Sequence, residues 1–214
     1  MNRGNKPGDN GMSIELHKGD LPDGLDFGEC VAIDTETLGL RPHRDRLCLV
    51  QLSAGDGNAH LVQFAKDTYD APNLKRILAD KNVTKIFHFG RFDLAILQRY
   101  LGVLAEPVFC TKIASRLART YTDRHGLKDI CRELLSVDIS KQQQSSDWGA
   151  AELTQAQRNY AASDVLYLHQ LREKLLEMLT REGRLGLAEA CCSFLPSRAL
   201  LDLAGWADED IFHH

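Results

Sequence analysis

Apolar positions in the first half of the chain gather in short runs that have the length of β-strands. An Asp-Gly turn signal in "AGDGN" separates the second run from the third, so the first three runs predict an antiparallel meander. Two short helical patterns, "APNLKRILAD" and "RFDLAILQRYLG", flank the fourth run, and helical periodicity dominates from Lys112 onward. The predicted strands are residues 29–36, 47–53, 59–64, 84–89 and 107–110.

The strongest helical pattern lies between Thr154 and Gly183. Thr154 with Gln157 three residues later predicts a capping box, and Gly183 fits a C-terminal cap. Apolar residues recur between them at spacings of three or four: Ala161, Val165, Leu168, Leu171, Leu175 and Leu179. The pattern predicts one helix over this span, and Pro196 is predicted to separate two closing helices further on.

Strands that alternate with helices and are followed by a helical part predict an α/β fold with a mixed sheet. We expect residues 13–214 to form a single domain, and Met1 to Met12, rich in Gly and Asn, to be disordered or added for expression. The chain is 43% hydrophobic and 26% charged, which is typical of a soluble globular protein. Its apolar runs are too short for a membrane span or a signal peptide, so we expect a cytoplasmic protein.

Charge and cysteine content narrow the function classes. The formal net charge of −4 argues against a sequence-independent binder of duplex DNA, but not against an enzyme that holds nucleic acid through divalent metals. The six cysteines include no Cys-x-x-Cys pair, so neither a zinc site nor a redox motif is predicted.

Five polar residues in three separate segments form the candidate site. Asp34 and Glu36 end a buried strand two residues apart, so both carboxylates point to the same face and repel one another unless a cation lies between them. Asp93 falls in the first turn of a helix that follows a strand. Tyr160 and Asp164 are four apart on one helix face. Each residue alone is better explained as a helix charge, an ion-pair partner or a packed aromatic, and only their combination favours a site.

These segments resemble the three motifs of the DEDD exonuclease superfamily: "DTET", the "FD" of "HFGRFD", and "YAASD". The tyrosine four residues before the last acid is typical of the DEDDy branch. The segments "LCLVQLS", "HGLKDICRELL" and "YAASDVLYL" are similar to ribonuclease D, and the resemblance covers Ser13 to Gly183. It implies a ribonuclease H-like fold, with a mixed five-stranded sheet flanked by helices.

The resemblance also implies an activity, which is removal of 5′ mononucleotides from the 3′ ends of RNA by two-metal-ion hydrolysis. The metal ligands would be Asp34, Glu36, Asp93 and Asp164, and their oxygen atoms suit Mg²⁺ or Mn²⁺. Tyr160 would orient the attacking water. The histidine branch of the superfamily has His five residues before the last acid, where this chain has Asn159.

Four residues beside the first two motifs would contact the 3′ nucleotide. The resemblance assigns backbone contact with the 3′ hydroxyl to Thr37, base packing to Leu38, and contacts with sugar, phosphate or base to His88 and Phe92. Leu38, His88 and Phe92 could equally be core residues.

Two features depart from ribonuclease D. The asparagine often found shortly before the second-motif acid is absent, since Phe89 and Gly90 occupy that stretch. About thirty residues follow Gly183, too few for an additional helical nucleic-acid-binding domain. An RNA 3′ end, such as that of a tRNA precursor, is the expected partner.

The alternatives are a DNA 3′–5′ exonuclease of the same branch, a non-catalytic nucleic-acid-binding module on the same fold, and purely structural acids. The oligomeric state is open.

Overall fold

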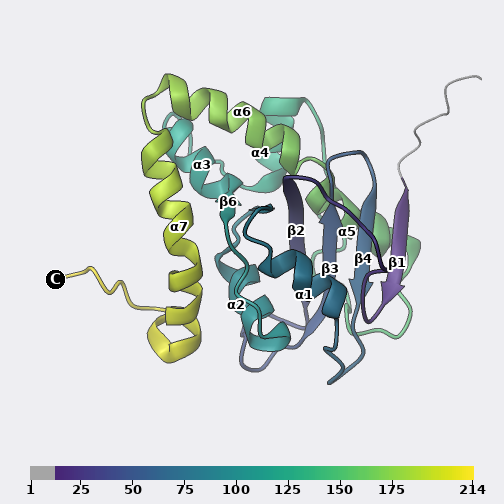
Figure 1. The fold of residues 1–214 in the computed structure, drawn as a ribbon. Helices are drawn as coiled ribbons and strands as arrows, with labels where there is room; N and C mark the ends of the chain where they lie inside the picture. The colour runs from purple at the N-terminus through teal and green to yellow at the C-terminus, as the bar shows by residue number, and fades with distance from the viewer. Residues whose placement is uncertain (1–12) are drawn as a thin grey trace, which may run out of the picture.

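A mixed sheet with helices on both faces forms the centre of the computed structural model, which describes residues 13–214 (Figure 1). The strand order is β1-β4-β3-β2-β5-β6, and only β3 runs antiparallel to its neighbours. The strands are β1 Ile14–Lys18, β2 Cys30–Thr37, β3 Leu47–Ser53, β4 Ala59–Gln63, β5 Thr84–Phe87 and β6 Val108–Cys110. The mixed α/β class and the antiparallel β2-β3-β4 meander are confirmed.

The predicted count of five strands is wrong, because β1 adds a sixth at the edge of the sheet. β1 pairs in parallel with β4, from Ile14 opposite Ala59 to Lys18 opposite Gln63. Its five residues carry only two apolar side chains, Ile14 and Leu16, which is too short a pattern to recognise in the sequence. Pairing with β4, and not a pattern in its own sequence, therefore makes this segment a strand. The predicted disorder of Met1 to Met12 concerns residues outside the part of the chain that the structure describes.

The helices divide between the two faces of the sheet. In Figure 1, α1 and α2 lie in front of the strands and α5 lies behind them. One hydrophobic core packs α1, α2 and α7 on the sheet, and a second packs α3, α4, α5 and α6 on the opposite face. The helices are α1 Pro72–Ala79, α2 Arg91–Leu101, α3 Thr111–Ala118, α4 Leu127–Leu135, α5 Gln155–Leu166, α6 Leu168–Arg181 and α7 Leu185–Leu201, which continues as the π-helical turn η1 Asp202–Trp206.

The single helix predicted between Thr154 and Gly183 is two helices. The Thr154–Gln157 capping box is present, and Gly183 has a φ of 66°, but the chain bends at Tyr167 between α5 and α6. No proline or glycine stands at this bend. The two helices instead pack on different neighbours, α5 on β2, β3 and β4 and α6 mainly on α3 and α4. Tertiary packing therefore decides the bend.

The prediction that Pro196 separates two helices is also wrong, since α7 runs through it. Proline in a helix interior costs roughly 3 kcal/mol, because it removes one backbone hydrogen bond and crowds the preceding turn. Pro196 is buried together with Leu195 and Ala199, and α7 packs on α2, α3 and β6. We infer that this burial offsets the cost.

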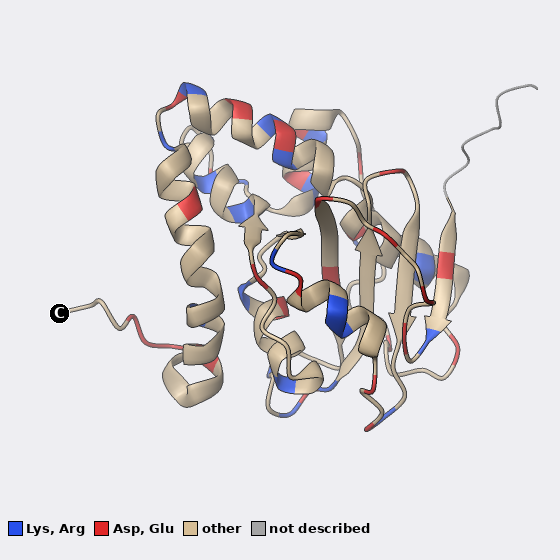
Figure 2. Ribbon diagram, in the orientation of Figure 1, with Lys and Arg blue, Asp and Glu red and all other residues tan. Residues whose placement is uncertain are grey.

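Charged residues are spread over the outer helices and loops and are not gathered in one block (Figure 2). Acids also stand within the central strand β2, which carries Asp34 and Glu36. Among the described residues, no helix is both long and apolar enough to cross a membrane.

Candidate active site

The candidate site lies where the carboxyl ends of the parallel strands β2, β5 and β6 meet. Open α/β sheets bind their ligands at this kind of edge, because chain segments leave neighbouring strands there in different directions. β2 ends with Asp34 and Glu36, β5 is followed by His88 and by α2, and β6 leads directly into Thr111 of α3. The nearly buried ring of His88 joins two of these segments through a 2.9 Å hydrogen bond between its Nδ1 and Thr111 Oγ1.

Three carboxylates from two elements form the centre of the site. Oxygens of Asp34, Glu36 and Asp164 all lie within 4.8 Å of one another. The first two come from alternate positions of β2, and the third comes from α5, which packs across β2 and β3. Gln51 lies opposite Asp34 in the β2-β3 register and donates a 3.1 Å hydrogen bond to its Oδ2. The packing of α5 therefore joins two sequence motifs that lie well over a hundred residues apart.

Asp93 reaches the same region from the other side of β2. It stands in the first turn of α2 and is 4% exposed. The hydroxyl of Thr35, which points to the face opposite Asp34 and Glu36, donates a 2.6 Å hydrogen bond to Asp93 Oδ1. The charge of Asp93 raises the pKa of all three other acids. The structure thus brings all four predicted acids together, with Asp93 outside the tight group of three.

Tyr160 lies one helical turn before Asp164 on α5. Its ring packs on that of Trp148, with the ring centroids 5.9 Å apart, and Trp148 itself is buried. The phenol lies beside Asp164 and lowers the pKa of that carboxyl, partly opposing the effect of burial. The capping box at Thr154 fixes the start of the helix, and with it the position of the Tyr160–Asp164 face.

Burial raises the pKa of every acid in the site, and repulsion by neighbouring acids adds to the effect for Asp34, Glu36 and Asp164. Burial is the largest cause for each of them. It raises the pKa of Asp34 well above its usual range, that of Glu36 to about 9, and those of Asp93 and Asp164 to about 7. The protein therefore stabilises the protonated acids when no cation is present.

In EDTA we expect the free energy of unfolding to fall as pH rises through the range between about 4 and about 9. Acids with raised folded-state pKa values hold protons there that the unfolded chain has already lost, so rising pH favours unfolding. Urea unfolding of the wild type and Asp34→Asn at about pH 5 and about pH 8 measures this, because the difference between the two cancels other titrating groups such as His88. Mg²⁺ should remove most of the fall. An equal pH dependence in both proteins would contradict the expectation.

The donor set of the site suits a hard divalent cation. The four side chains offer only carboxylate oxygens, which favour Mg²⁺ and Mn²⁺ over the softer metals that nitrogen and sulfur ligands select. A bound cation would also reverse the repulsion that now raises the pKa of Asp34, Glu36 and Asp164. These residues fit such an ion on both counts.

The four predicted substrate residues have different surroundings. Leu38 is 53% exposed beside the site, so the core alternative is wrong for it. The Thr37 hydroxyl donates to the carbonyl of Gly39, which fixes the turn after β2. Burial lowers the pKa of His88 to about 3, so the ring is neutral at physiological pH. Phe92 packs against the core under α2, which favours a packing role over substrate contact.

Sequence reasoning missed two side chains near the site, Phe89 after β5 and Lys112 at the start of α3. Phe89 is 48% exposed, and the ammonium of Lys112 lies 4.0 Å from the centre of its ring. The φ of Phe89 is 66°, a left-handed conformation that is unusual for a residue other than glycine and is concentrated at functional sites. The only signal in the sequence for Phe89 was an aromatic residue just before Gly90, where α2 begins, and this signal is weak. Sequence reasoning also missed Gln51, for which the signal was a lone amide inside a mostly apolar strand.

A family model described as 3′–5′ exonuclease matches residues 20–180, a span that contains all four acids and Tyr160. The chain belongs to the 3′–5′ exonuclease family. The ribonuclease H-like fold implied by the sequence motifs is thereby confirmed, with six strands in place of five.

Relatives within the exonuclease family include a solved structure of similar length. NrnC of Brucella melitensis bound to pGG is 61% identical, covers 95% of this chain and 99% of its own, and superposes with a TM-score of 0.92. A structure of NrnC with bound Mg²⁺ has 60% identity and a TM-score of 0.91, and the match covers 95% of this chain and all of that one.

Two curated relatives are longer proteins. Ribonuclease D of Gluconacetobacter diazotrophicus is 39% identical over 155 residues, which are 72% of this chain and 39% of that protein. DNA polymerase I of Aquifex aeolicus is 37% identical over 147 residues, 69% of this chain and 24% of that one. The chain therefore spans well under half the length of the curated relatives that it matches.

Proposed function

We propose that this protein is a metal-dependent 3′–5′ exoribonuclease that releases 5′ mononucleotides from RNA 3′ ends. The observation that carries the proposal is the cluster of three partly buried carboxylates of Asp34, Glu36 and Asp164, whose oxygens lie within 4.8 Å of one another, with Asp93 beside it. Buried like charges are costly, and a cation-dependent reaction gives a reason to keep them. Membership of the exonuclease family and the similarity to ribonuclease D support this activity.

In this proposal the four acids hold two divalent cations, Mg²⁺ or Mn²⁺. Such a pair lowers the pKa of an attacking water and stabilises the leaving 3′ oxygen. The NrnC structure with bound Mg²⁺ supports a divalent cation as a ligand of this chain. The charges of Asp93, Asp164 and Glu36 all act on Asp34, so this acid is the best candidate to serve both ions. The Thr35 hydroxyl orients Asp93 and the Gln51 amide orients Asp34.

Tyr160 would position the attacking water. Burial, followed by the charge of Asp164, raises the pKa of its phenol well above the usual range. The phenol therefore keeps its proton at neutral pH and can donate a hydrogen bond, but it cannot act as the general base.

The substrate end would rest on the exposed residues beside the acids. Leu38 offers an apolar surface for the terminal base, and the turn at Thr37 offers backbone groups for the 3′ hydroxyl. Phe89 with Lys112 above its ring adds a stacking surface and a positive charge, a combination that suits single-stranded nucleic acid. The neutral ring of His88 can hydrogen-bond sugar or phosphate without adding charge.

The substrate is proposed to be RNA, with maturation of RNA 3′ ends, such as those of tRNA precursors, as the setting. The pGG ligand of NrnC suggests that short oligonucleotides also belong in the test. The similarity to DNA polymerase I keeps a DNA substrate as the second candidate. Retention of all four acids and Tyr160 argues against a non-catalytic module.

The test compares 5′-labelled single-stranded RNA, matching DNA and pGG, each with Mg²⁺, Mn²⁺ or EDTA. We expect the RNA to shorten from its 3′ end one nucleotide at a time, with either metal and not in EDTA. If the DNA shortens faster than the RNA, DNA is the substrate. If pGG alone is cleaved, the activity is restricted to the shortest oligonucleotides. Binding without cleavage under every condition would contradict the catalytic proposal.

A further inference from the structure

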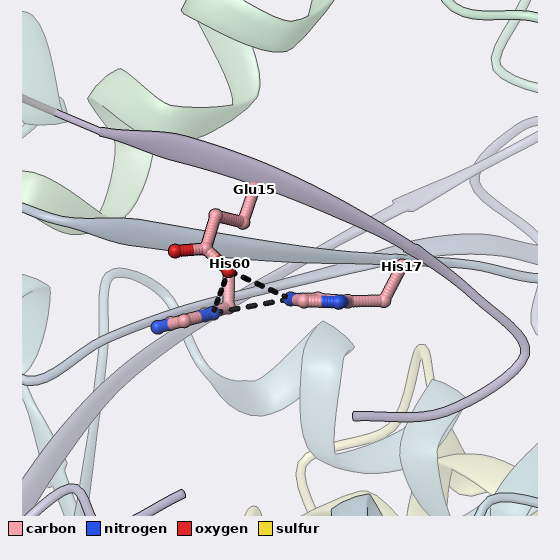
Figure 3. A group of neighbouring side chains, drawn as sticks. All are labelled: Glu15, His17 and His60. Carbon is pink, nitrogen blue, oxygen red and sulfur yellow. Dashed lines mark hydrogen bonds and ion pairs between the residues drawn. The ribbon is translucent and has the colours of Figure 1, made fainter. Parts of the chain in front are cut away.

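A second group of metal-ligating side chains lies at the edge of the sheet, on β1 and β4 (Figure 3). It consists of Glu15, His17 and His60, and we refer to it as the edge cluster. Glu15 and His17 are two apart on β1 and so share a face. His60 lies opposite Glu15 in the parallel β1-β4 register, which places its side chain on that same face.

The sheet separates the edge cluster from the candidate active site. Cross-strand partners share a face, and one row of partners runs from Asp34 through Gln51 and Leu61 to Leu16. Asp34, Glu36 and Asp164 therefore lie on the face that Leu16 shares. Asp93 approaches from the opposite face, but at β2, which is three strands away from β1. Glu15 and His17 flank Leu16 in β1 and point to the opposite face.

The three ligand atoms lie at separations close to those of a metal site. His17 Nε2 and His60 Nδ1 are 3.1 Å apart, and Glu15 Oε2 lies 4.0 Å from the first and 3.9 Å from the second. Ligands at ordinary zinc bond lengths in a tetrahedron are about 3.3 Å apart. The two nitrogens need to separate only slightly, and the carboxylate needs to approach by a fraction of an ångström.

The imidazoles are held in place, while the carboxylate is free to move. The side chains of His17 and His60 are 16% and 13% exposed, whereas that of Glu15 is 56% exposed. The two rings stack with centroids 5.4 Å apart, and the ring of Phe27 meets the His60 ring edge-on. A rigid pair of nitrogens with a mobile oxygen beside it gives an ion an entry path from solvent.

The chemistry of the three atoms favours a particular class of ion. Two neutral imidazoles and one carboxylate are ligands of zinc and similar divalent transition metals, whereas Mg²⁺ prefers oxygen atoms alone. Three protein ligands leave a fourth position open to solvent.

We propose that Glu15, His17 and His60 bind one divalent transition-metal ion, with Zn²⁺ as the best match, and that this ion joins the edge strand β1 to β4. The alternative is a hydrogen-bonded histidine pair, in which Nε2 and Nδ1 share a proton and Glu15 is only a nearby charge. That alternative accounts for the 3.1 Å contact but predicts no affinity for a metal.

The test is calorimetric titration of the metal-free full chain with ZnCl₂ in excess Mg²⁺. We expect His17→Gln and His60→Gln each to weaken one zinc site by more than about tenfold, because losing a ligand costs more than an outer-shell change does. Zn²⁺ should also raise the melting temperature of the wild type more than that of these variants. Exposed Glu15→Gln, the substitution least able to disturb folding, should weaken the same site.

Two controls locate the zinc site. Replacing His213 and His214 by glutamine removes two exposed histidines elsewhere and should change nothing. Asp164→Asn alters the catalytic acids and should leave this site intact. Zinc binding that survives all three edge-cluster substitutions, or that is lost only in Asp164→Asn, would overturn the proposal. Failure of the wild type to bind zinc at micromolar concentrations would overturn it as well.

Discussion

Asp34→Asn is expected to lower kcat/KM for RNA by at least about 10³-fold, because the substitution removes a charge from the centre of the proposed two-metal site. The asparagine keeps the size of the side chain and can still accept the hydrogen bond from Gln51. The loss should therefore come from the missing negative charge, and not from a cavity in β2. Hydrolysis rates of labelled RNA at saturating Mg²⁺ measure the effect.

The same substitution should stabilise the metal-free protein. Burial and three neighbouring acids raise the pKa of Asp34, so a neutral amide relieves both desolvation and repulsion. We expect a higher melting temperature than the wild type in EDTA and a smaller gain on addition of Mg²⁺. Asp138→Asn, at an exposed acid paired with Arg132, is the matched control and should change neither quantity. Wild-type hydrolysis in Asp34→Asn would contradict the proposed role of this acid.

Tyr160→Phe is expected to lower kcat by about 10²-fold and to leave KM close to that of the wild type. The phenylalanine ring can keep the contact with Trp148, so the packing of α5 should be preserved. Only the hydroxyl beside Asp164 is lost, and in the proposed mechanism that group positions the attacking water. Single-turnover hydrolysis with excess enzyme separates this step from product release.

If Tyr160 had only a packing role, Tyr160→Phe would keep the wild-type kcat. The Mg²⁺ dependence of hydrolysis should be the same in Tyr160→Phe as in the wild type, since the four acids remain. Tyr121→Phe removes the hydroxyl of an exposed tyrosine bonded to Glu133, far from the motifs, and should have full activity. An unchanged kcat in Tyr160→Phe, or a large shift in its metal requirement, would remove Tyr160 from the proposed mechanism.

Much of the candidate site could be predicted because its parts are local. The period of two residues in a strand is enough to place Asp34 and Glu36 on one face, and the helical period places Tyr160 above Asp164. The capping box at Thr154 sets the start of α5 in the structure as in the sequence. Motif order then supplied the expectation that these pairs meet.

Other parts of the site depend on contacts between segments that the sequence keeps apart. The hydrogen bond from Thr35 to Asp93 lies on the far face of β2. The left-handed backbone conformation of Phe89 places its ring under Lys112. Neither contact follows from a local period, because each needs the relative position of two packed elements. The edge cluster is similar, since Glu15 and His17 meet His60 only through the parallel register of β1 and β4.

The sequence by itself therefore determined the α/β class, most strands and helices, and the residues of the four-acid site, because strand and helix periods are short-range properties of the backbone. Tertiary structure decided the sixth strand, the bend at Tyr167 and the unbroken helix through Pro196. Backbone pairing with β4 stabilises β1, and burial against neighbouring elements stabilises the bend and the helix through Pro196. These contributions override the weak local preferences that a sequence pattern records.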